Sequence, residues 1–141
     1  MKKLNYFLSL IGFLAIVSCK PDEPIDPIPT QNKVITSNIT KNTTWYSDTI
    51  YQLGGRITVV DGVTLTIEPG TIIKGEAGTG ANATALLIAR GGKLMAEGTS
   101  SLPIIFTSVA DEITPEDILA GNFASPNLDP TVNGLWGGVI V

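Results

Sequence analysis

Apolar and polar residues alternate along residues 57–67, ITVVDGVTLTI, with a period of two. Such a period places every second side chain on the same face of a strand, so it predicts short β-strands with one apolar face. Asp61-Gly62 separates the two runs and Pro69-Gly70 follows them, and both pairs are typical of tight turns. The pattern therefore predicts strand, turn, strand and turn in close succession.

The same order returns about 29 positions later, in residues 86–99, LLIARGGKLMAEGT. With one gap opposite Pro69, the alignment also sets Gly70 against Gly98 and Thr71 against Thr99. Repeats of this length are typical of solenoids, whose coils stack on one another. The inward pairs of such a stack would be Val63 over Gly92, Leu65 over Leu94 and Ile67 over Ala96.

Two local alternatives compete with a solenoid. Asp61-Gly62 between alternating apolar residues is a strong hairpin signal, and several short strands between turns also fit an antiparallel sandwich. A hairpin gives no reason for the whole order to recur. We therefore expect an all-β parallel solenoid, with the antiparallel sandwich as the alternative.

The expected domain comprises residues 34–141: an N-terminal cap, about two coils, an inserted loop at 110–133 and the start of a third coil. Within the insertion, Thr114 as N-cap, Pro115 and the Gly121 exit predict one helical turn. The last residues, 139–141, are apolar and strand-like. We expect the fold to be incomplete there, with the missing C-terminal coils of the same protein completing it.

Trp45 and Tyr46 allow two interpretations. As core residues they would seal the first coil, because large aromatic side chains dominate buried area. As exposed residues they would form a platform on which a sugar stacks.

Residues 1–18 have a basic start at Lys2 and Lys3 and an apolar run shorter than the ~18 residues of a membrane helix, which predicts a secretory signal peptide. Residues 15–19, AIVSC, are similar to the lipobox of bacterial lipoproteins. That resemblance implies cleavage before Cys19 and its acylation, which would anchor the protein in a lipid bilayer. Cys19 is the only cysteine, so an intrachain disulfide is excluded, and a free thiol is the alternative.

Residues 19–33 are expected to form the lipidated cysteine and a disordered tether, because proline and acidic residues dominate the segment. Residues 20–23, KPDE, resemble the signal that follows the cysteine in Bacteroidota lipoproteins moved to the outer face of the outer membrane. The resemblance implies an exported, outer-membrane protein exposed at the cell surface. An ordinary charged linker is the alternative.

The charge balance narrows the function further. The formal net charge is −4, and removal of Lys2 and Lys3 with the leader would make it more negative. Nucleic-acid binding needs a basic footprint, so an acidic chain argues against that partner. The chain also has no histidine, which removes the commonest general base and metal ligand.

The run from residue 57 to residue 99, with PIIFTSVADEITP, ASPNLDPT and GLWGGVIV after it, resembles uncharacterised Bacteroidota surface lipoproteins. The resemblance implies a right-handed parallel β-helix of the pectin-lyase-like kind. Enzymes with that fold use calcium-binding aspartates and a basic residue along one face, and no such cluster can be placed here. The fold by itself implies little about chemistry.

Acidic residues supply the candidate sites. The repeat would stack Glu68 on Glu97, where paired carboxylates could hold a cation, although solvated surface glutamates are the simpler interpretation. The insertion offers possible ligand or Ca²⁺ contacts whose spacing differs from an EF-hand. They are Asp111, Glu112, Glu116, Asp117 and Asp129.

Three functions fit these observations. We favour a non-catalytic surface lipoprotein whose β-helix binds a polysaccharide or another surface component. The alternatives are the N-terminal part of a polysaccharide lyase or hydrolase whose catalytic coils are missing, and a structural or adhesive stalk.

Overall fold

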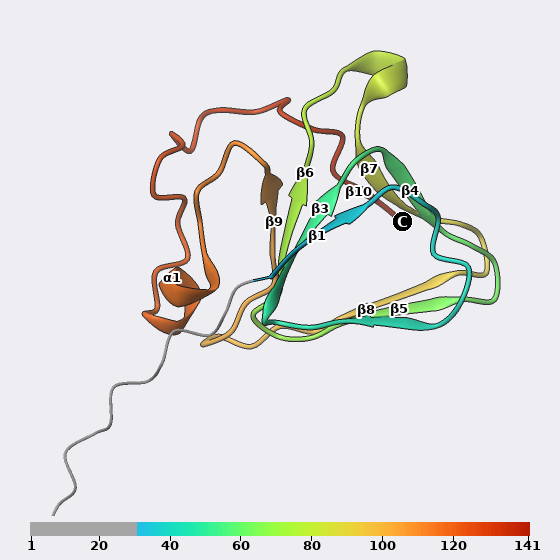
Figure 1. Cartoon of the computed structure of the whole chain (residues 1–141), viewed down its shortest axis with the longest axis horizontal. Coiled ribbons are helices and arrows are strands. Elements are labelled where there is room, and N and C mark those ends of the chain that lie inside the picture. Colours follow the sequence, from blue (N-terminus) through green and yellow to red (C-terminus); the bar gives the residue numbers. More distant parts are fainter. Residues whose placement is uncertain (1–30) are drawn as a thin grey trace, which may run out of the picture.

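The computed structural model describes residues 31–141 and folds them into a parallel β-helix of triangular cross-section (Figure 1). The predicted signal peptide, residues 1–18, and Cys19 lie outside the described residues. Every strand pair within the described range is parallel, which is the arrangement that stacked coils require.

Three sheets form the sides of the triangle. Sheet A contains β1 (Gln31–Ile35), β3 (Thr49–Leu53), β6 (Ile72–Gly75) and β9 (Ile105–Ser108). Sheet B contains β4 (Arg56–Val59), β7 (Ala85–Ile88) and β10 (Val139–Ile140). Sheet C contains β2 (Thr43–Trp45), β5 (Thr64–Ile67) and β8 (Lys93–Ala96).

The register confirms the predicted stacking. Leu65 pairs with Leu94 and Ile67 pairs with Ala96, while the Lys93 amide donates to the Val63 carbonyl oxygen at 2.9 Å. Strands β4 and β5 belong to different sheets and pair with β7 and β8, so the hairpin and the antiparallel sandwich are both wrong.

The alignment and the register diverge after the second copy of the repeat. The alignment sets Thr71 against Thr99, but the Ile105 amide donates to the Thr71 carbonyl oxygen, and Ile72 pairs with Ile105. The turn after β8 is therefore longer than the turn after β5. A longer corner turn leaves the stacking of the strands on either side intact.

The segment before the repeat is itself a coil. Strand β1 pairs with β3, Ile39 bridges to Val59, and β2 pairs with β5. The N-terminal cap expected from the sequence is therefore the first turn of the solenoid. Because β1 begins at Gln31, this turn also takes in the last three residues of the segment expected to be a tether.

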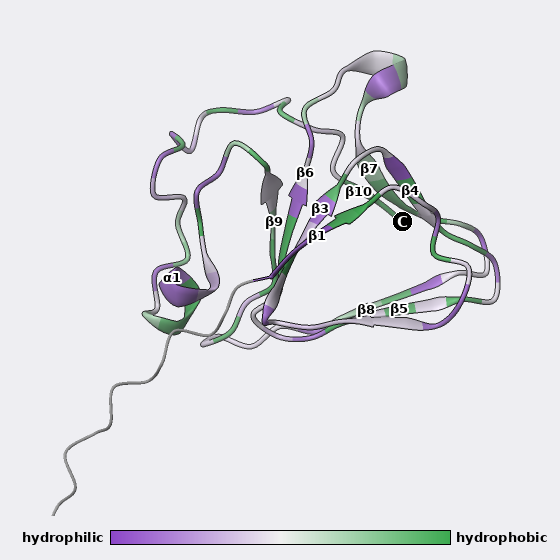
Figure 2. Ribbon diagram, in the orientation of Figure 1, coloured by the Kyte–Doolittle hydropathy of each residue, from purple (hydrophilic) through white to green (hydrophobic). Residues whose placement is uncertain are grey.

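The interior of the triangle holds the main core. Figure 2 shows hydrophobic residues along the strands that surround it, with more hydrophilic residues in many of the connections. Trp45 is buried and stacks on Tyr51 of the next coil, with ring centroids 4.6 Å apart, whereas Tyr46 is half exposed. The core interpretation is thus confirmed for Trp45 and wrong for Tyr46.

The insertion builds a second core on the outside of sheet A. Ile50 and Ile72 point outward from β3 and β6, and Ile113 and Ile118 of the insertion pack over them. Ile118 belongs to α1 (Pro115–Leu119), the predicted helical turn, which begins with a capping box between Thr114 and Asp117. The insertion is therefore a packed cover for this sheet.

Candidate functional site

Asp111 is the most deeply buried acidic residue of the predicted site in the insertion, with 4% of its surface exposed. Its Oδ2 accepts a hydrogen bond from Thr107 Oγ1 at 2.7 Å. Its Oδ1 accepts from the Ile113 amide at 3.0 Å and from Ser125 Oγ at 2.8 Å. The bond from Thr107 fastens the insertion to β9 and the other two bonds hold the insertion together, so the Asp111 carboxylate is already engaged in the fold.

Lys74 joins the same network from β6. Its Nζ donates to the Asp111 backbone carbonyl oxygen at 2.6 Å. Burial lowers the pKa of Lys74, although the negative charges of Asp111, Asp117 and Glu112 oppose that shift. Burial alone would raise the pKa of Asp111, but its hydrogen bonds and the Lys74 charge outweigh burial and hold that pKa below the ordinary value.

The other predicted contacts lie in separate local structures. Asp117 Oδ2 accepts from the Thr114 amide within the capping box, and Asp129 accepts from the amide and hydroxyl of Thr131 in a turn. The Thr131 hydrogen bonds also lower the pKa of Asp129. Glu112 and Glu116 are exposed.

Among residues 31–141, no group of three or more His, Cys, Asp or Glu residues is arranged to hold a metal ion. The fold thus places Asp111 in a buried network, Asp117 in a helix cap and Asp129 in a turn, and it leaves the other two predicted contacts exposed. It does not bring them together as one ligand set.

Glu68 and Glu97 do lie on neighbouring coils, as the repeat predicts. They directly follow β5 and β8, and both line a shallow pocket of about 280 Å³ beside Thr66 and Met95. Met95 is almost half exposed, so the pocket opens to solvent. This arrangement offers two carboxylates and no further acidic ligand.

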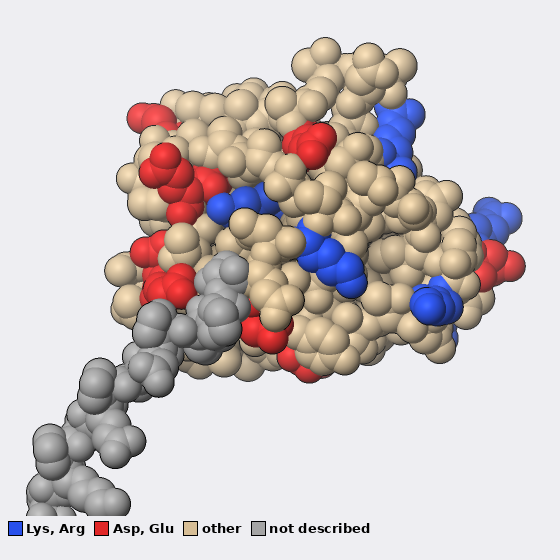
Figure 3. Space-filling view, viewed as in Figure 1, with Lys and Arg blue, Asp and Glu red and all other residues tan. Residues whose placement is uncertain are grey.

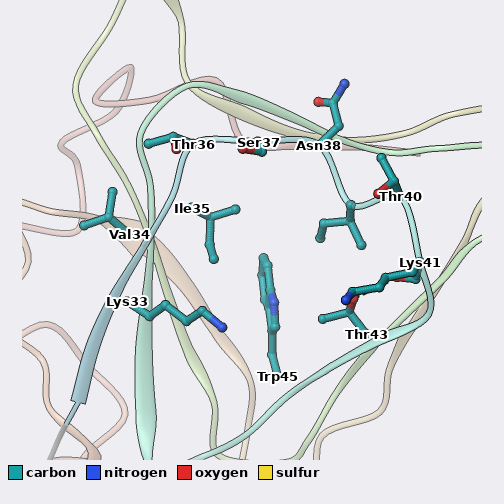
Figure 4. A pocket seen from close by; sticks show the side chains of 11 residues that line it. Lys33, Val34, Ile35, Thr36, Ser37, Asn38, Thr40, Lys41, Thr43 and Trp45 are labelled. Carbon is teal, nitrogen blue, oxygen red and sulfur yellow. Dashed lines mark hydrogen bonds between the residues drawn. The ribbon is translucent and has the colours of Figure 1, made fainter.

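A second hollow lies at the end of the solenoid where β1 begins. We call it the N-terminal hollow; it has a volume of about 270 Å³ and is drawn in Figure 4. Ile35, Ile39 and Trp45 form its apolar floor. Polar and basic side chains dominate the remainder of its lining: Lys33, Thr36, Ser37, Asn38, Thr40, Lys41 and Thr43, with Val34 beside them.

The hydrogen bonds of this lining leave several donors available. Asn38 Oδ1 accepts from the Thr58 amide of the next coil, and in Figure 4 the Asn38 side chain points away from the hollow. Thr43 Oγ1 donates to the Lys41 carbonyl oxygen. The side-chain hydroxyls of Thr36, Ser37 and Thr40 have no hydrogen-bond partner within residues 31–141.

The electrostatics of the hollow differ from those of the insertion. Figure 3 shows acidic side chains gathered over the insertion around α1, while the middle of the same face carries basic side chains. Lys33 and Lys41 line the hollow, and no acidic residue does. The sequence places Lys33 at the end of the expected tether and Lys41 in the expected N-terminal cap. Two lysines spaced in this way give no signal that folding brings them to one hollow.

These features define the class of protein: a right-handed parallel β-helix with one insertion packed on an outer face. Residues 37–121 match the family model described as the pectate-lyase like beta helix domain, so the chain belongs to that family. No curated protein and no solved structure gives a significant match. No helix in the described part of the chain is long and apolar enough to cross a membrane.

Proposed function

We propose that this protein is a surface-displayed lipoprotein whose β-helix binds a glycan or another surface component without catalysing a reaction. The observation that carries the proposal is the N-terminal hollow. It combines an apolar floor with a rim of hydroxyl and ammonium groups. Pockets for small polar ligands share this plan, in which apolar walls supply contact area and a few polar groups fix orientation.

The acidic residues of the insertion support the non-catalytic part of the proposal. Catalytic or calcium-binding carboxylates must face a substrate or an ion. Asp111, Asp117 and Asp129 instead accept hydrogen bonds from their own surroundings. Their positions are explained by the folding of the insertion alone.

The position of the hollow suits attachment through Cys19. The hollow lies in the terminal coil that contains β1, the described strand nearest to Cys19 in the sequence. A protein held by an acylated Cys19 in the outer membrane would keep this end close to the membrane. Envelope glycans would then be the ligands within easiest reach.

Anchoring can be tested independently of binding. Cells that produce the full chain should incorporate labelled palmitate into it, and Cys19→Ala should abolish the label. External protease should degrade the wild-type protein on intact cells. Label on the Cys19→Ala variant, or full protection from protease in intact but not lysed cells, would contradict anchoring or surface display respectively.

Glycan binding can be tested with the full chain purified in detergent and applied to an array of neutral and acidic polysaccharides. The proposal predicts binding to at least one class of glycan. It also predicts that binding survives Asp129→Asn and Glu116→Gln in the insertion but is weakened by substitutions in the hollow. Binding that depends on the insertion alone would move the site there.

The family match favours a second candidate, the cleavage of a polysaccharide by a longer form of this protein. Support for further coils comes from the inward residues Ile88, Leu94 and Phe106, which are only partly buried at the end opposite the hollow. A fall in the viscosity of an acidic polysaccharide incubated with the full chain would favour the enzyme. We expect binding without a fall in viscosity.

A further inference from the structure

We propose that the N-terminal hollow recognises a carboxylate-bearing sugar, with Lys33 and Lys41 as the groups that hold the carboxylate. The inference rests on the proposed glycan-binding function and specifies the class of ligand and the site. It predicts a preference for acidic over neutral glycans, because a neutral glycan would gain nothing from the two ammonium groups.

The two lysines approach the hollow from different parts of the coil. Lys33 belongs to β1, and Lys41 lies between the Ile39 bridge and β2. In Figure 4 their side chains extend toward each other from opposite sides of the hollow and end on either side of Trp45. Residues far apart around the coil thus bring two positive charges to one opening.

These charges have no partner within the described range. Neither lysine forms an ion pair or a side-chain hydrogen bond with another residue among 31–141, and the hollow has no acidic lining residue. Two ammonium groups on one hollow repel each other unless an anion lies between them. The arrangement therefore favours an anionic ligand.

The surrounding groups indicate that this anion is part of a sugar. A carboxylate would accept charge-assisted hydrogen bonds from Lys33 and Lys41, which are about twice as strong as neutral ones. Sugar hydroxyls would meet the hydroxyls of Ser37 and Thr40 on the rim. Pockets for drug-sized ligands measure ~300–1,000 Å³, so about 270 Å³ suits one sugar unit, such as a chain end.

Carboxylates have a second source in the chain itself, since Asp22, Glu23 and Asp26 precede β1. The chemistry of recognition would be the same for both sources. We commit to the sugar because the hydroxyl groups of the rim match a ligand rich in hydroxyls, which aspartate and glutamate side chains lack.

The test compares two matched ligands, oligosaccharides of β-1,4-linked glucose and of β-1,4-linked glucuronic acid, which differ only in the carboxylate. Binding to the full chain in detergent is measured by titration calorimetry at low and at physiological salt. The wild type should bind the glucuronic acid form at least about tenfold more tightly, because a hydrogen bond to a charged group is about twice as strong as a neutral one. Salt should reduce that preference.

The test variant is Lys33→Gln with Lys41→Gln, and the control is Arg90→Gln with Lys93→Gln. All four residues are exposed, so neither change should affect folding, which circular dichroism checks. The test variant should lose the preference for the acidic ligand, and the control should keep it. Lys33→Arg with Lys41→Arg should restore most of the preference, since arginine retains the charge.

Three results would overturn the inference. Equal affinity for both ligands, unchanged by the lysine substitutions, would leave glycan binding standing and remove the carboxylate specificity. Binding of the acidic ligand only after Asp22→Asn, Glu23→Gln and Asp26→Asn would identify the chain's own carboxylates as the occupant. Failure to bind any glycan on the array would refute both the inference and the proposed function.

Discussion

The two faces of sheet A are both apolar, but they are buried in different ways. The inner face contributes Tyr51 and Ile73 to the core that the coils enclose among themselves. The outer face contributes Ile50 and Ile72 to a core that exists only because the insertion folds back over it. The repeat therefore specifies its own interior, whereas the outer core depends on one irregular segment.

This difference predicts two degrees of cooperativity. Interior side chains are shared by successive coils, so the loss of one weakens the stack as a whole. The outer core connects one insertion to one sheet, so its loss should release the insertion and leave the stack in place. Substitutions in the two cores can separate these behaviours.

The largest expected effect comes from Leu65→Ala in the interior. Leu65 has no exposed surface and pairs with Thr43 and Leu94 on either side. Truncation of a buried leucine should reduce the free energy of unfolding by about 2–5 kcal/mol. Urea unfolding followed by circular dichroism should show one transition at lower urea; a transition unchanged in position would contradict the stacked core.

Ile118→Ala should have the next largest effect and a different character. Ile118 is buried against the outer face of sheet A, so we expect a loss in the lower part of the ~2–5 kcal/mol range. Hydrogen exchange should show lost protection in the insertion, residues 110–133, with β3, β5 and β6 still protected. Equal loss of protection in all strands would show that the two cores unfold together.

Asp111→Asn tests the polar attachment of the insertion. The variant disturbs buried hydrogen bonds from Thr107, Ile113 and Ser125, so we expect a cost of about 1–3 kcal/mol. The lowered pKa of Asp111 means that its ionised form stabilises the fold above the unfolded pKa near ~3.9, and that this stability is lost as pH falls through the folded value.

The pH dependence supplies the check on that substitution. Between pH 7 and pH 3, protection of the insertion from hydrogen exchange should fall in the wild type and change less in Asp111→Asn. Asp129→Asn is the control. It alters an exposed turn and should leave the exchange of the Ile113 and Ile118 amides unchanged. The same pH dependence in Asp111→Asn as in the wild type would show that another group controls it.

The smallest expected effect comes from Glu68→Gln combined with Glu97→Gln. Both residues line an open pocket outside either core, so the free energy of unfolding should change by no more than about 0.5 kcal/mol. Thermal melts with and without added Ca²⁺ measure this. A clear stabilisation by Ca²⁺ that the double variant abolishes would establish these glutamates as a cation site.

Much of the fold could be predicted because its signal is local and repeated. The alternation around Leu65 and Leu94 gives strands, and its recurrence gives the stacking. The outer core also has a signal in the sequence that the repeat obscures: Ile72-Ile73 and Ile105-Phe106 are adjacent apolar residues, which indicates strands covered on both faces. The pattern does not show which segment covers the outer face, and in the structure that segment is the insertion.

The candidate site was less predictable because it depends on closure of the coil. The acidic residues of the insertion look like ligand contacts in the sequence. In the folded chain, however, Asp111 and Asp117 accept hydrogen bonds that form only after folding. Lys33 and Lys41 look like ordinary surface charges until β1 and β2 are placed on two sides of a triangle. Chemistry that arises from closure leaves no motif in the sequence.

The stacking of the coils can be measured directly with nitroxide labels on outward positions in a Cys19→Ala background. Thr66 and Met95 are partners on neighbouring strands of sheet C, whereas Arg56 and Thr66 lie on different sheets. We predict strong dipolar broadening of the electron paramagnetic resonance spectrum for labels at Thr66 and Met95, and little for labels at Arg56 and Thr66. The reverse result would mean that β4 and β5 fold back on each other and would contradict the β-helix.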